Sequence, residues 1–170
     1  LYHAMHSTCS QKARICLYEK GVEWESRLVD LESKEQVSQA YLRLNPNGVV
    51  PTLVHDGVPI VDSSVICEYL DSLAPSPVLF PKSGPERWKT LVLGSLADGI
   101  LDAALLLVYE KRFRHEEKWH AAWQQRQQAK IDRALDQLEK SPPGWGTSPD
   151  YGHLTLAAAL GYLDFRHEGK

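Results

Sequence analysis

An α/β domain followed by an all-α domain is the architecture that the sequence predicts. Before about residue 75, short β-type runs alternate with helical runs, and after it every periodic segment is helical. The intervening segment, 74–85, contains four prolines and is typical of a linker. We therefore expect one domain at residues 1–75, a linker at 76–85 and a second domain at 86–170.

The first domain is predicted to begin with a strand, a helix and a second strand. β-type runs at 1–3 and about 25–31 flank a helical run at 11–20, which ends at Gly21 as a C-terminal stop. Crossover connections of this kind join parallel strands. A small mixed sheet is the expected result.

A second helix, a hairpin and a third helix follow. The helix at 34–44 is closed by the turn sequence NPNG at 45–48. Asp56-Gly57 is a hairpin signal between two short strands, and a helix is expected at 63–73. The resulting order, β-α-β-α-β-β-α, places helices on the faces of the sheet.

Helices at 87–114, 118–140 and 154–167 are predicted for the second domain. The first two carry apolar residues at helical spacing, and the third is apolar almost all round at its start, so it is expected to be buried. Because the chain starts at Leu1 within a strand and stops at Lys170 soon after a helix, we expect trimmed or incompletely ordered termini.

Composition argues against several classes of partner. The 170 residues carry a formal net charge of −3, which gives no reason to expect nucleic acid or an anionic membrane surface. No apolar run approaches the roughly 20 residues that span a bilayer, and no secretory leader is recognisable. Cys9, Cys16 and Cys67 are odd in number and form no Cys-x-x-Cys pair, which favours a reducing, cytoplasmic compartment. The last two have apolar neighbours on helices and are expected in the core.

Four small polar or thiol residues, Ser7-Thr8-Cys9-Ser10, lie where the first strand meets the first helix. A helix cap needs only one of them, and Ser10, directly before the helical run, is the expected N-cap. Thr8 is expected to shape the loop. Ser7 and Cys9 are left as candidates for chemistry.

Four ordered motifs resemble the cytosolic glutathione S-transferases. They are STCSQKARICLYEKG, NPNGVVPTLVHDG, DSSVICEYL and LGYLDFR, at fitting separations over nearly the whole chain. The first motif is most like the zeta class, which has a similar Ser-Ser-Cys-Ser, and the second half is more like bacterial transferases of broader type. The resemblance implies a thioredoxin-like N-terminal domain (βαβαββα), an all-helical C-terminal domain and a homodimer, with the helix at 63–73 against the long helices of a partner.

The family binds glutathione and attacks an electrophile with its thiolate. The resemblance assigns the stabilisation of that thiolate to Ser7, which stands 14 residues before the Gly of EKG, as the family's catalytic Ser does. A hydroxyl donor at the positive end of a helix favours the ionised sulfur. Cys9 is the competitor, because a working thiol there would form mixed disulfides with glutathione. Cys9 lies two residues later than the catalytic cysteine of Cys-type relatives, so Ser7 is favoured. In zeta-type enzymes the cysteine that matches Cys9 lines the active site.

Val50 and Pro51 are the second part of the implied glutathione site. The matching proline of the family is cis, which turns the preceding backbone outward. The N–H and C=O of Val50 are then expected to pair with the cysteinyl backbone of glutathione, as an added strand would.

Asp62 and Ser63, between a strand and a helix, are the third part. By the resemblance, Asp62 takes or supports the γ-glutamyl ammonium and Ser63 takes the γ-glutamyl carboxylate; either is also a plain helix cap. Lys34 and Gln36 are candidates for the glycine carboxylate.

A pocket for a small hydrophobic electrophile is expected between the domains. Its candidate lining residues come from the first loop and the long helix: Met5, His6, Tyr109, Arg112 and Phe113. No metal is expected, because His3-x-x-His6 lacks partners at ligand spacing and His115 and His120 do not share a helical face.

The expected function is glutathione transfer to a small electrophile, as in detoxification. Two variants use the same activated sulfur: glutathione-dependent isomerisation of a maleyl-type diacid, with Arg14 and Arg112 as candidate cations, and glutathione-dependent ether cleavage or dehalogenation. Thiol-disulfide reduction through Cys9 and a non-catalytic, transferase-like binding module are the alternatives. The chain retains Ser7 and the pair Asp62-Ser63, which favours an enzyme over a binding module.

The start of the last helix departs from the family pattern. A Ser/Thr-x-x-Asp capping box is common there, whereas this chain has Asp150 followed by His153 in place of the reciprocal acid. We expect Asp150 to cap the helix, and His153→Asp to raise the melting temperature.

Overall fold

The structure, a computed structural model, describes residues 1–144 and 148–167. Contacts divide the chain into two compact units, Leu1–Phe80 and Pro81–Lys170. The first unit is a mixed α/β domain and the second contains helices in its described part, so the predicted fold class is confirmed.

The first unit has the predicted order of elements, with one short 3-10 helix added. In chain order they are β1 (Tyr2–His3), α1 (Thr8–Glu19), β2 (Arg27–Leu28), η1 (Glu35–Val37), α2 (Gln39–Leu42), β3 (Thr52–His55), β4 (Val58–Val61) and α3 (Ser63–Leu73). The four strands form one sheet in the order β2-β1-β3-β4. Only β1 and β2 pair in parallel, as expected, and the other two pairs are antiparallel. This is the thioredoxin-like topology that the resemblance implies.

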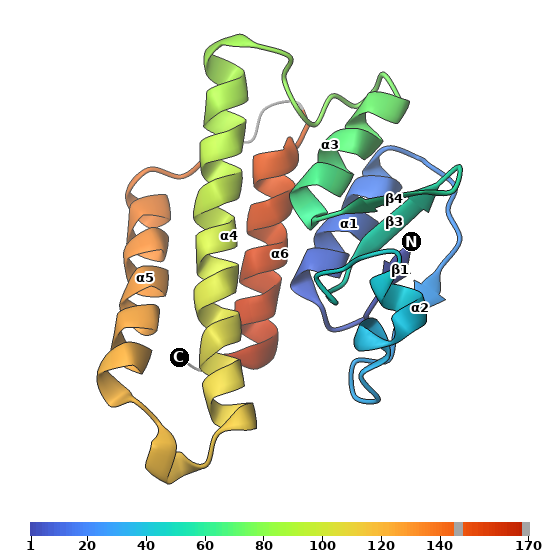
Figure 1. The fold of residues 1–170 in the computed structure, drawn as a ribbon. Helices are drawn as coiled ribbons and strands as arrows, with labels where there is room; N and C mark the ends of the chain where they lie inside the picture. The colour runs from blue at the N-terminus through green and yellow to red at the C-terminus, as the bar shows by residue number, and fades with distance from the viewer. Residues whose placement is uncertain (145–147, 168–170) are drawn as a thin grey trace. The chain divides into compact units, whose positions relative to one another are not determined.

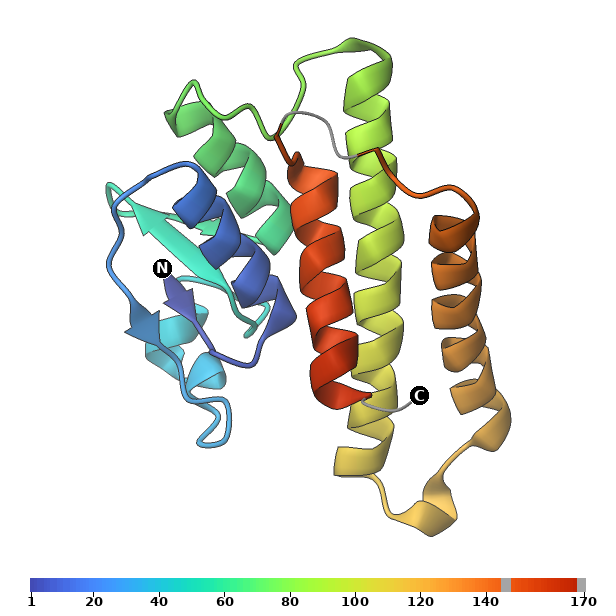
Figure 2. The same ribbon diagram turned by 180° about the vertical axis from the view of Figure 1, so that it is seen from behind.

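Helices cover both faces of this sheet. α1 and α3 lie side by side on one face, and α2 lies on the other (Figures 1 and 2). Leu17, Ile66 and Leu70 from the paired helices are at most 1% exposed. Cys16 and Cys67 are buried in the same layer, with the Cys16 thiol 3.6 Å from the Cys67 carbonyl oxygen, which confirms their expected place in the core.

Two predicted helix boundaries are wrong for reasons of capping. α1 begins at Thr8 because Ser7, not Ser10, is its N-cap: the Ser7 Oγ accepts the Ser10 amide at 3.2 Å. The helix expected at 34–44 is divided, since Ser38 caps a new helix, α2, by accepting the Tyr41 amide at 3.2 Å. β2 covers only two residues of the run expected at 25–31.

A buried ion pair fixes the proline-rich segment after α3. Lys20, the C-cap of α1, has a side chain that is 0% exposed, and its Nζ lies 2.8 Å from Asp71 Oδ1 and contacts the Pro77 carbonyl. The Asp71 carboxylate also accepts the amides of Leu79 at 2.9 Å and Phe80 at 3.1 Å. Residues 77–80 are therefore packed as part of the first unit.

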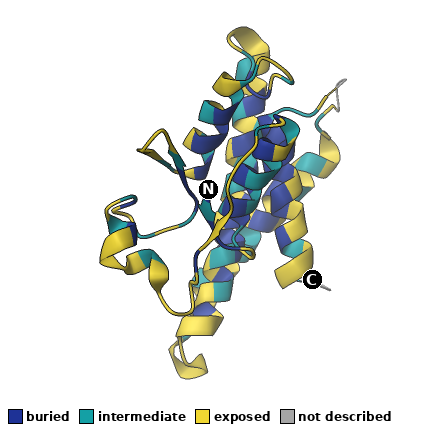
Figure 3. Ribbon diagram, turned by 90° about the vertical axis from the view of Figure 1, so that its right-hand side faces the viewer, coloured by how far each residue is buried: buried dark blue, intermediate teal, exposed yellow. Residues whose placement is uncertain are grey.

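In its described residues the second unit contains three long helices, and α4 lies between the other two (Figure 1). The elements are α4 (Gly84–Phe113), the 3-10 helix η2 (Glu116–Lys118), α5 (Ala121–Lys140) and α6 (Tyr151–Arg166). α4 and α6 approach closely at glycines: a Cβ on Gly152 would lie 2.8 Å from the Thr90 carbonyl oxygen, and one on Gly94 would lie 2.5 Å from the Tyr151 ring. Figure 3 shows buried residues along the helices of this unit.

α4 is apolar over more of its length than the sequence analysis allowed. By length and composition it is the one helix among the described residues that could cross a membrane, with an 18-residue window of mean hydropathy 2.0. The expectation that no run approaches this length is therefore wrong. The apolar run has another role, because Ala97, Ile100 and Ala104 on it form the centre of the core of the second unit.

The expected cap of α6 is present and is more complete than predicted. Asp150 Oδ1 accepts the His153 amide at 3.1 Å, and the His153 ring nitrogen Nδ1 lies 3.4 Å from the Asp150 amide and 2.7 Å from Oδ1. When Nδ1 carries no proton, the imidazole accepts the Asp150 amide and so takes the reciprocal place in a capping box; when Nδ1 is protonated, it donates to Asp150 Oδ1 instead. The reason for expecting a gain in melting temperature from His153→Asp disappears.

Acid is expected to weaken this cap. Burial by itself would raise the pKa of Asp150, but hydrogen bonds from Thr90 and His153 and the charge of His153 outweigh it and hold that pKa below its usual range. Since the folded pKa lies below the unfolded value of about 3.9, the stabilisation is complete above that pH and is lost as the pH falls through the folded pKa.

Urea unfolding between about pH 5 and pH 3 measures this loss in the wild type and in Asp150→Asn, which keeps a good N-cap without the charge. The stability difference between the two proteins should shrink on acidification. Asp136→Asn, an exposed site on α5, is the control and should show no such trend. A difference that stays constant down to the lowest pH would contradict the prediction.

Candidate functional site

Ser7 lies at the junction of β1 and α1 and is half-buried. Its Oγ accepts the Ser10 amide at 3.2 Å, and its carbonyl accepts the Gln11 amide at 2.9 Å. A hydroxyl has one proton to donate and two lone pairs. Because Ser7 acts here as an acceptor, its proton is free to be donated to a group beyond the helix end, where the helix dipole favours negative charge.

Cys9 lies one residue inside α1 and is a free, half-buried thiol. Ser10, which the sequence analysis took for the cap, is fully buried, and its Oγ accepts the Ala4 amide at 3.3 Å. Ser10 thus holds the loop before the helix, while Ser7 caps it. Thr8 is buried at the first helical position.

Pro51 follows a cis peptide bond, as the resemblance implies. It is buried directly before β3, and Val50 before it is half-buried. The Val50 backbone therefore lies outside the β3 ladder, at the point where the chain enters the sheet.

Asp62 caps α3 from a left-handed backbone conformation, φ 71°. Its Oδ1 accepts the Ser64 amide at 2.8 Å and the Val65 amide at 3.3 Å. Ser63 is buried at 5% exposure, and within the described residues no hydrogen bond to its hydroxyl is found. The cap reading is thus confirmed for Asp62, and the Ser63 hydroxyl is available for a ligand.

Gln36 lies next to the turn at 45–48, and Lys34 is the residue directly before η1. A Cβ on Gly48, where φ is +62°, would come within 3.1 Å of Val37 Cγ1 and 3.4 Å of the Gln36 carbonyl oxygen, so η1 packs against this turn and the position favours glycine. Gln36 Oε1 is buried without a hydrogen-bond partner, so this amide oxygen is an unsatisfied acceptor in the structure. Lys34 is exposed.

Sheet topology brings most of these segments together. β3 runs antiparallel to both of its neighbours, and Thr52 at its start pairs with Tyr2 of β1 and Val61 of β4. The end of β1, the start of β3 and the end of β4 therefore lie at the same end of the sheet. The segments that carry Ser7, Val50-Pro51 and Asp62-Ser63 follow or precede these strand ends directly.

The candidate electrophile residues fall in both units. Met5 in the first unit is 58% exposed, and its carbonyl accepts a hydrogen bond from Arg14 at 3.2 Å. In the second unit, Tyr109 and Phe113 are exposed and their rings lie edge to face, 5.2 Å apart. The Arg112 guanidinium lies 5.6 Å from the centre of the Phe113 ring. His6 is exposed on the first loop.

Comparison with known proteins decides the family. Two family models match the chain: Glutathione S-transferase, N-terminal domain, at residues 1–78, and Glutathione S-transferase, C-terminal domain, at residues 121–170. Glutathione S-transferase 1 of Dianthus caryophyllus is 31% identical over 164 residues, which are 94% of this chain and 73% of that protein. The chain belongs to the glutathione S-transferase family.

Two further similar proteins extend the comparison. The crystal structure of a glutathione transferase family member from Pseudomonas fluorescens Pf-5, with bound glutathione, is 36% identical and has a TM-score of 0.89; the match covers 98% of this chain and 83% of that one. The probable maleylacetoacetate isomerase of Vibrio cholerae is 38% identical over 150 residues, which are 82% of this chain and 66% of that protein.

Sequence reasoning missed the residues that hold the start of β3. Tyr41, Asn45 and Thr52 are each at most 4% exposed, and their polar groups bond to one another and to the Val49 carbonyl. The predicted turn at 45–48 was a partial signal for Asn45. No local pattern identified Tyr41 or Thr52, because these two residues bond to each other and come into contact only when the sheet has formed.

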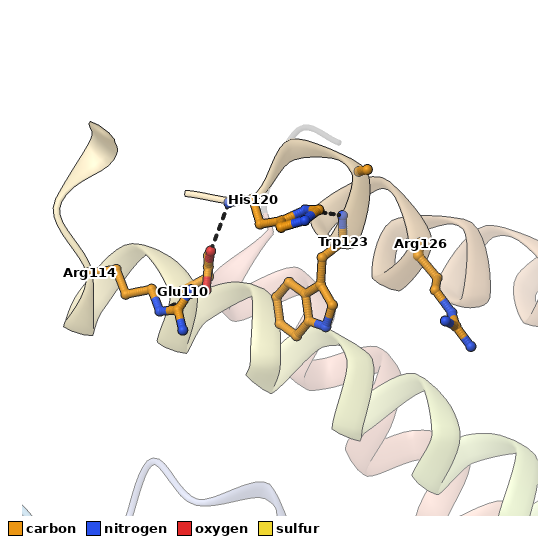
Figure 4. Close-up of a pocket in the computed structure, with 6 residues that line it drawn as sticks. Glu110, Arg114, His120, Trp123 and Arg126 are labelled. Carbon is orange, nitrogen blue, oxygen red and sulfur yellow. Dashed lines mark hydrogen bonds and ion pairs between the residues drawn. The ribbon is translucent and has the colours of Figure 1, made fainter. Parts of the chain in front are cut away.

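A pocket of about 570 Å³ in the second unit is lined by none of the predicted site residues (Figure 4). Its floor includes Glu110, a buried carboxylate that accepts the His120 amide at 3.0 Å and lies 3.5 Å from Arg114. Trp123 and Arg126 complete its wall. Glu110 here ties the end of α4 to the start of α5. Among the described residues, no group of three or more His, Cys, Asp or Glu is arranged to hold a metal ion.

Proposed function

We propose that this protein is a glutathione transferase in which Ser7 stabilises the glutathione thiolate. The observation that carries the proposal is the Ser7 hydroxyl, which accepts the Ser10 amide and so keeps its own proton for a ligand at the N-terminus of α1. A free thiol with a pKa of about 8.5 is mostly protonated at pH 7, so a donated hydrogen bond together with the helix dipole increases the reactive fraction.

Other segments of the first unit would bind the rest of the glutathione molecule. Val50 would pair with the cysteinyl backbone, and the Ser63 hydroxyl would take the γ-glutamyl carboxylate. Asp62 uses Oδ1 for its cap and has its second oxygen for the γ-glutamyl ammonium. Lys34 and the Gln36 amide would take the glycine carboxylate. The bound thiolate then attacks an electrophilic carbon, forming a C–S bond while the leaving group departs with the electron pair.

A second activity is supported by one comparison. The match to a probable maleylacetoacetate isomerase suggests glutathione-dependent isomerisation of a cis diacid. Such a substrate needs cations to hold its carboxylates, and Arg14 and Arg112 are the candidates. Conjugation with a chromogenic electrophile and isomerisation of a maleyl diacid should be assayed side by side.

Calorimetry with glutathione tests the proposal directly. We expect saturable binding by the wild type in the millimolar range or below, and conjugation of a chromogenic electrophile by the same preparation. No detectable heat at about 10 mM ligand, where a millimolar site would be nearly filled, would favour a non-catalytic module instead.

Substitution distinguishes a catalytic Cys9 thiol from a catalytic Ser7 hydroxyl. A Cys9→Ala variant should keep conjugation if Ser7 is the working group. If Cys9 is the working thiol, glutathione-dependent disulfide exchange should disappear in Cys9→Ala and survive in Ser7→Ala. That second result would replace the proposed transferase with a reductase.

We also propose that the protein is a cytoplasmic homodimer. Trp88 and Val92 on α4 are 65% and 67% exposed, and together with Gly84 and Pro85 they line a mostly apolar hollow. A large exposed apolar patch of this kind is typical of an interface.

Trp88→Glu should therefore give a monomer by size-exclusion chromatography with light scattering. Tyr18→Glu, at an even more exposed aromatic on α1, is the matched control and should leave the mass of the wild type unchanged. A wild type that is monomeric, or a Trp88→Glu variant that stays dimeric, would contradict this interface.

A further inference from the structure

Four polar groups form a closed ring of hydrogen bonds at the start of β3. The Tyr41 hydroxyl donates to the Val49 carbonyl oxygen at 2.8 Å and lies 2.9 Å from Thr52 Oγ1. The Asn45 side-chain amide donates to the same carbonyl at 2.9 Å and to Thr52 Oγ1 at 3.0 Å. Each group in the ring thus contacts two others.

The protons of this ring can be assigned without conflict. The Asn45 NH2 group uses both of its hydrogens, one on Val49 and one on Thr52. Because Tyr41 donates to Val49, the Thr52 hydroxyl donates to Tyr41, and every donor in the ring has an acceptor. In a buried setting such a satisfied network makes one geometry strongly preferred.

Burial and packing hold the Tyr41 side chain in place. Tyr41 is 4% exposed, and its ring lies edge to face against Tyr2 of β1, with centroids 6.0 Å apart. Its amide is bound by the Ser38 hydroxyl at the start of α2. Burial also raises the pKa of Tyr41, which keeps its hydroxyl protonated as a donor.

The ring encloses the two residues proposed to receive the glutathione backbone. Val49 and Thr52 are the neighbours of Val50 and Pro51 on either side, and both are bonded to Tyr41. The Tyr41 hydroxyl therefore bridges the two chain segments that flank Val50 and Pro51, and the Asn45 amide makes a second bridge between the same groups. Among the described residues, no hydrogen bond joins this ring to Ser7.

We propose that Tyr41 is a positioning residue for glutathione: its hydroxyl joins the Val49 carbonyl to Thr52 and so holds the Val50 backbone ready to pair with the ligand. This rests on the proposed function. Because the ring contacts the binding segment and no catalytic atom, its loss changes the affinity for glutathione rather than the rate of the bound complex.

Tyr41→Phe removes only the hydroxyl and keeps the packed ring. We expect the glutathione Kd by calorimetry, and KM for glutathione, to rise about three- to tenfold, which corresponds to the loss of one hydrogen bond in a ring that Asn45 still partly closes. The value of kcat at saturating glutathione should stay within about twofold of the wild type. Tyr18→Phe, whose side chain is 83% exposed on α1, is the matched control and should change neither value.

Thr52 provides a second, independent set of variants. Thr52→Val keeps the shape of the side chain and removes the hydroxyl, so it should raise the glutathione Kd and KM as Tyr41→Phe does. Thr52→Ser keeps the hydroxyl and should bind glutathione with wild-type affinity. The double variant Tyr41→Phe/Thr52→Val should bind little worse than either single variant, because both changes open the same ring.

A merely structural role predicts a different pattern. If Tyr41→Phe has a lower melting temperature but an unchanged glutathione Kd and KM, the inference is overturned and the proposed transferase function stands. If kcat falls and KM does not change, the assignment to positioning is also overturned. If the wild type itself fails to bind glutathione, the proposed function fails and this inference fails with it.

Discussion

Ser7→Gly is expected to lower kcat/KM for conjugation by about 100-fold, in line with the loss of one donor to a developing or stabilised anion. Glycine is itself an acceptable N-cap, so the free energy of unfolding should fall by only a few tenths of a kcal/mol. The Ser7 hydroxyl has two roles: it accepts the Ser10 amide as the cap of α1, and its proton is proposed to be donated to the thiolate. This substitution tests the second role with little change in the first. Steady-state kinetics and urea unfolding on the same preparation measure both.

The pH dependence of the rate gives a second readout for Ser7. Without its donor, the thiol of bound glutathione should ionise near its ordinary pKa of about 8.5. The deficit of Ser7→Gly relative to wild type should then shrink as the assay pH rises toward about 9, where the thiol ionises unaided.

Two further substitutions serve as controls for Ser7. Ser7→Thr keeps both the cap and the hydroxyl and should retain most of the activity. Ser7→Ala should lose activity and also about 1 kcal/mol of stability through the missing cap. A glycine variant that conjugates at the wild-type rate would refute the assignment of Ser7.

Lys20→Met is expected to lower the free energy of unfolding by about 3 to 5 kcal/mol, the range found when one partner of a buried ion pair is removed. The Lys20 side chain is 0% exposed, and its loss leaves the Asp71 carboxylate without its counter-charge. Asp71 would still accept the Leu79 and Phe80 amides, but as a poorly solvated charge. Asp71→Asn should cost a similar amount, because it leaves the ammonium unpaired.

An exposed ion pair in the same protein is the control for Lys20. Arg27 and Glu25 lie 2.9 Å apart, with side chains that are 58% and 74% exposed. Arg27→Met should change the stability by less than about 0.5 kcal/mol, because surface pairs contribute little. Equal effects of Lys20→Met and Arg27→Met in urea unfolding would contradict the prediction for the buried pair.

Local signals predicted many elements of the first unit correctly. The Asp56-Gly57 turn joins β3 and β4 as expected, and α3 covers the predicted residues. These features depend on turn chemistry and on periodicity within one segment, which a sequence displays directly. Pro51 is cis, but that expectation came from the resemblance and not from the local pattern.

Capping was harder to predict because neighbouring residues compete for the same role. Ser7 and Ser10 both satisfy the local pattern of an N-cap, and the wrong one was chosen. The structure assigns Ser7 to the cap because the Ser10 hydroxyl is buried and bound to the Ala4 amide. His153 shows the same limit, since an imidazole can take the reciprocal place that the sequence pattern reserves for an acid.

The types of residue and their order along the chain indicated the family, the two-domain architecture and the candidate residues Ser7, Val50-Pro51 and Asp62-Ser63. Their meeting at one end of the sheet follows from the antiparallel pairing of β3 with β1 and β4, which brings distant segments together. The ring of Tyr41, Asn45 and Thr52 around Val49 depends on the same folding. Hydrogen bonds between side chains and a distant carbonyl require positions set by packing, so they belong to the tertiary structure and leave no periodic trace in the sequence.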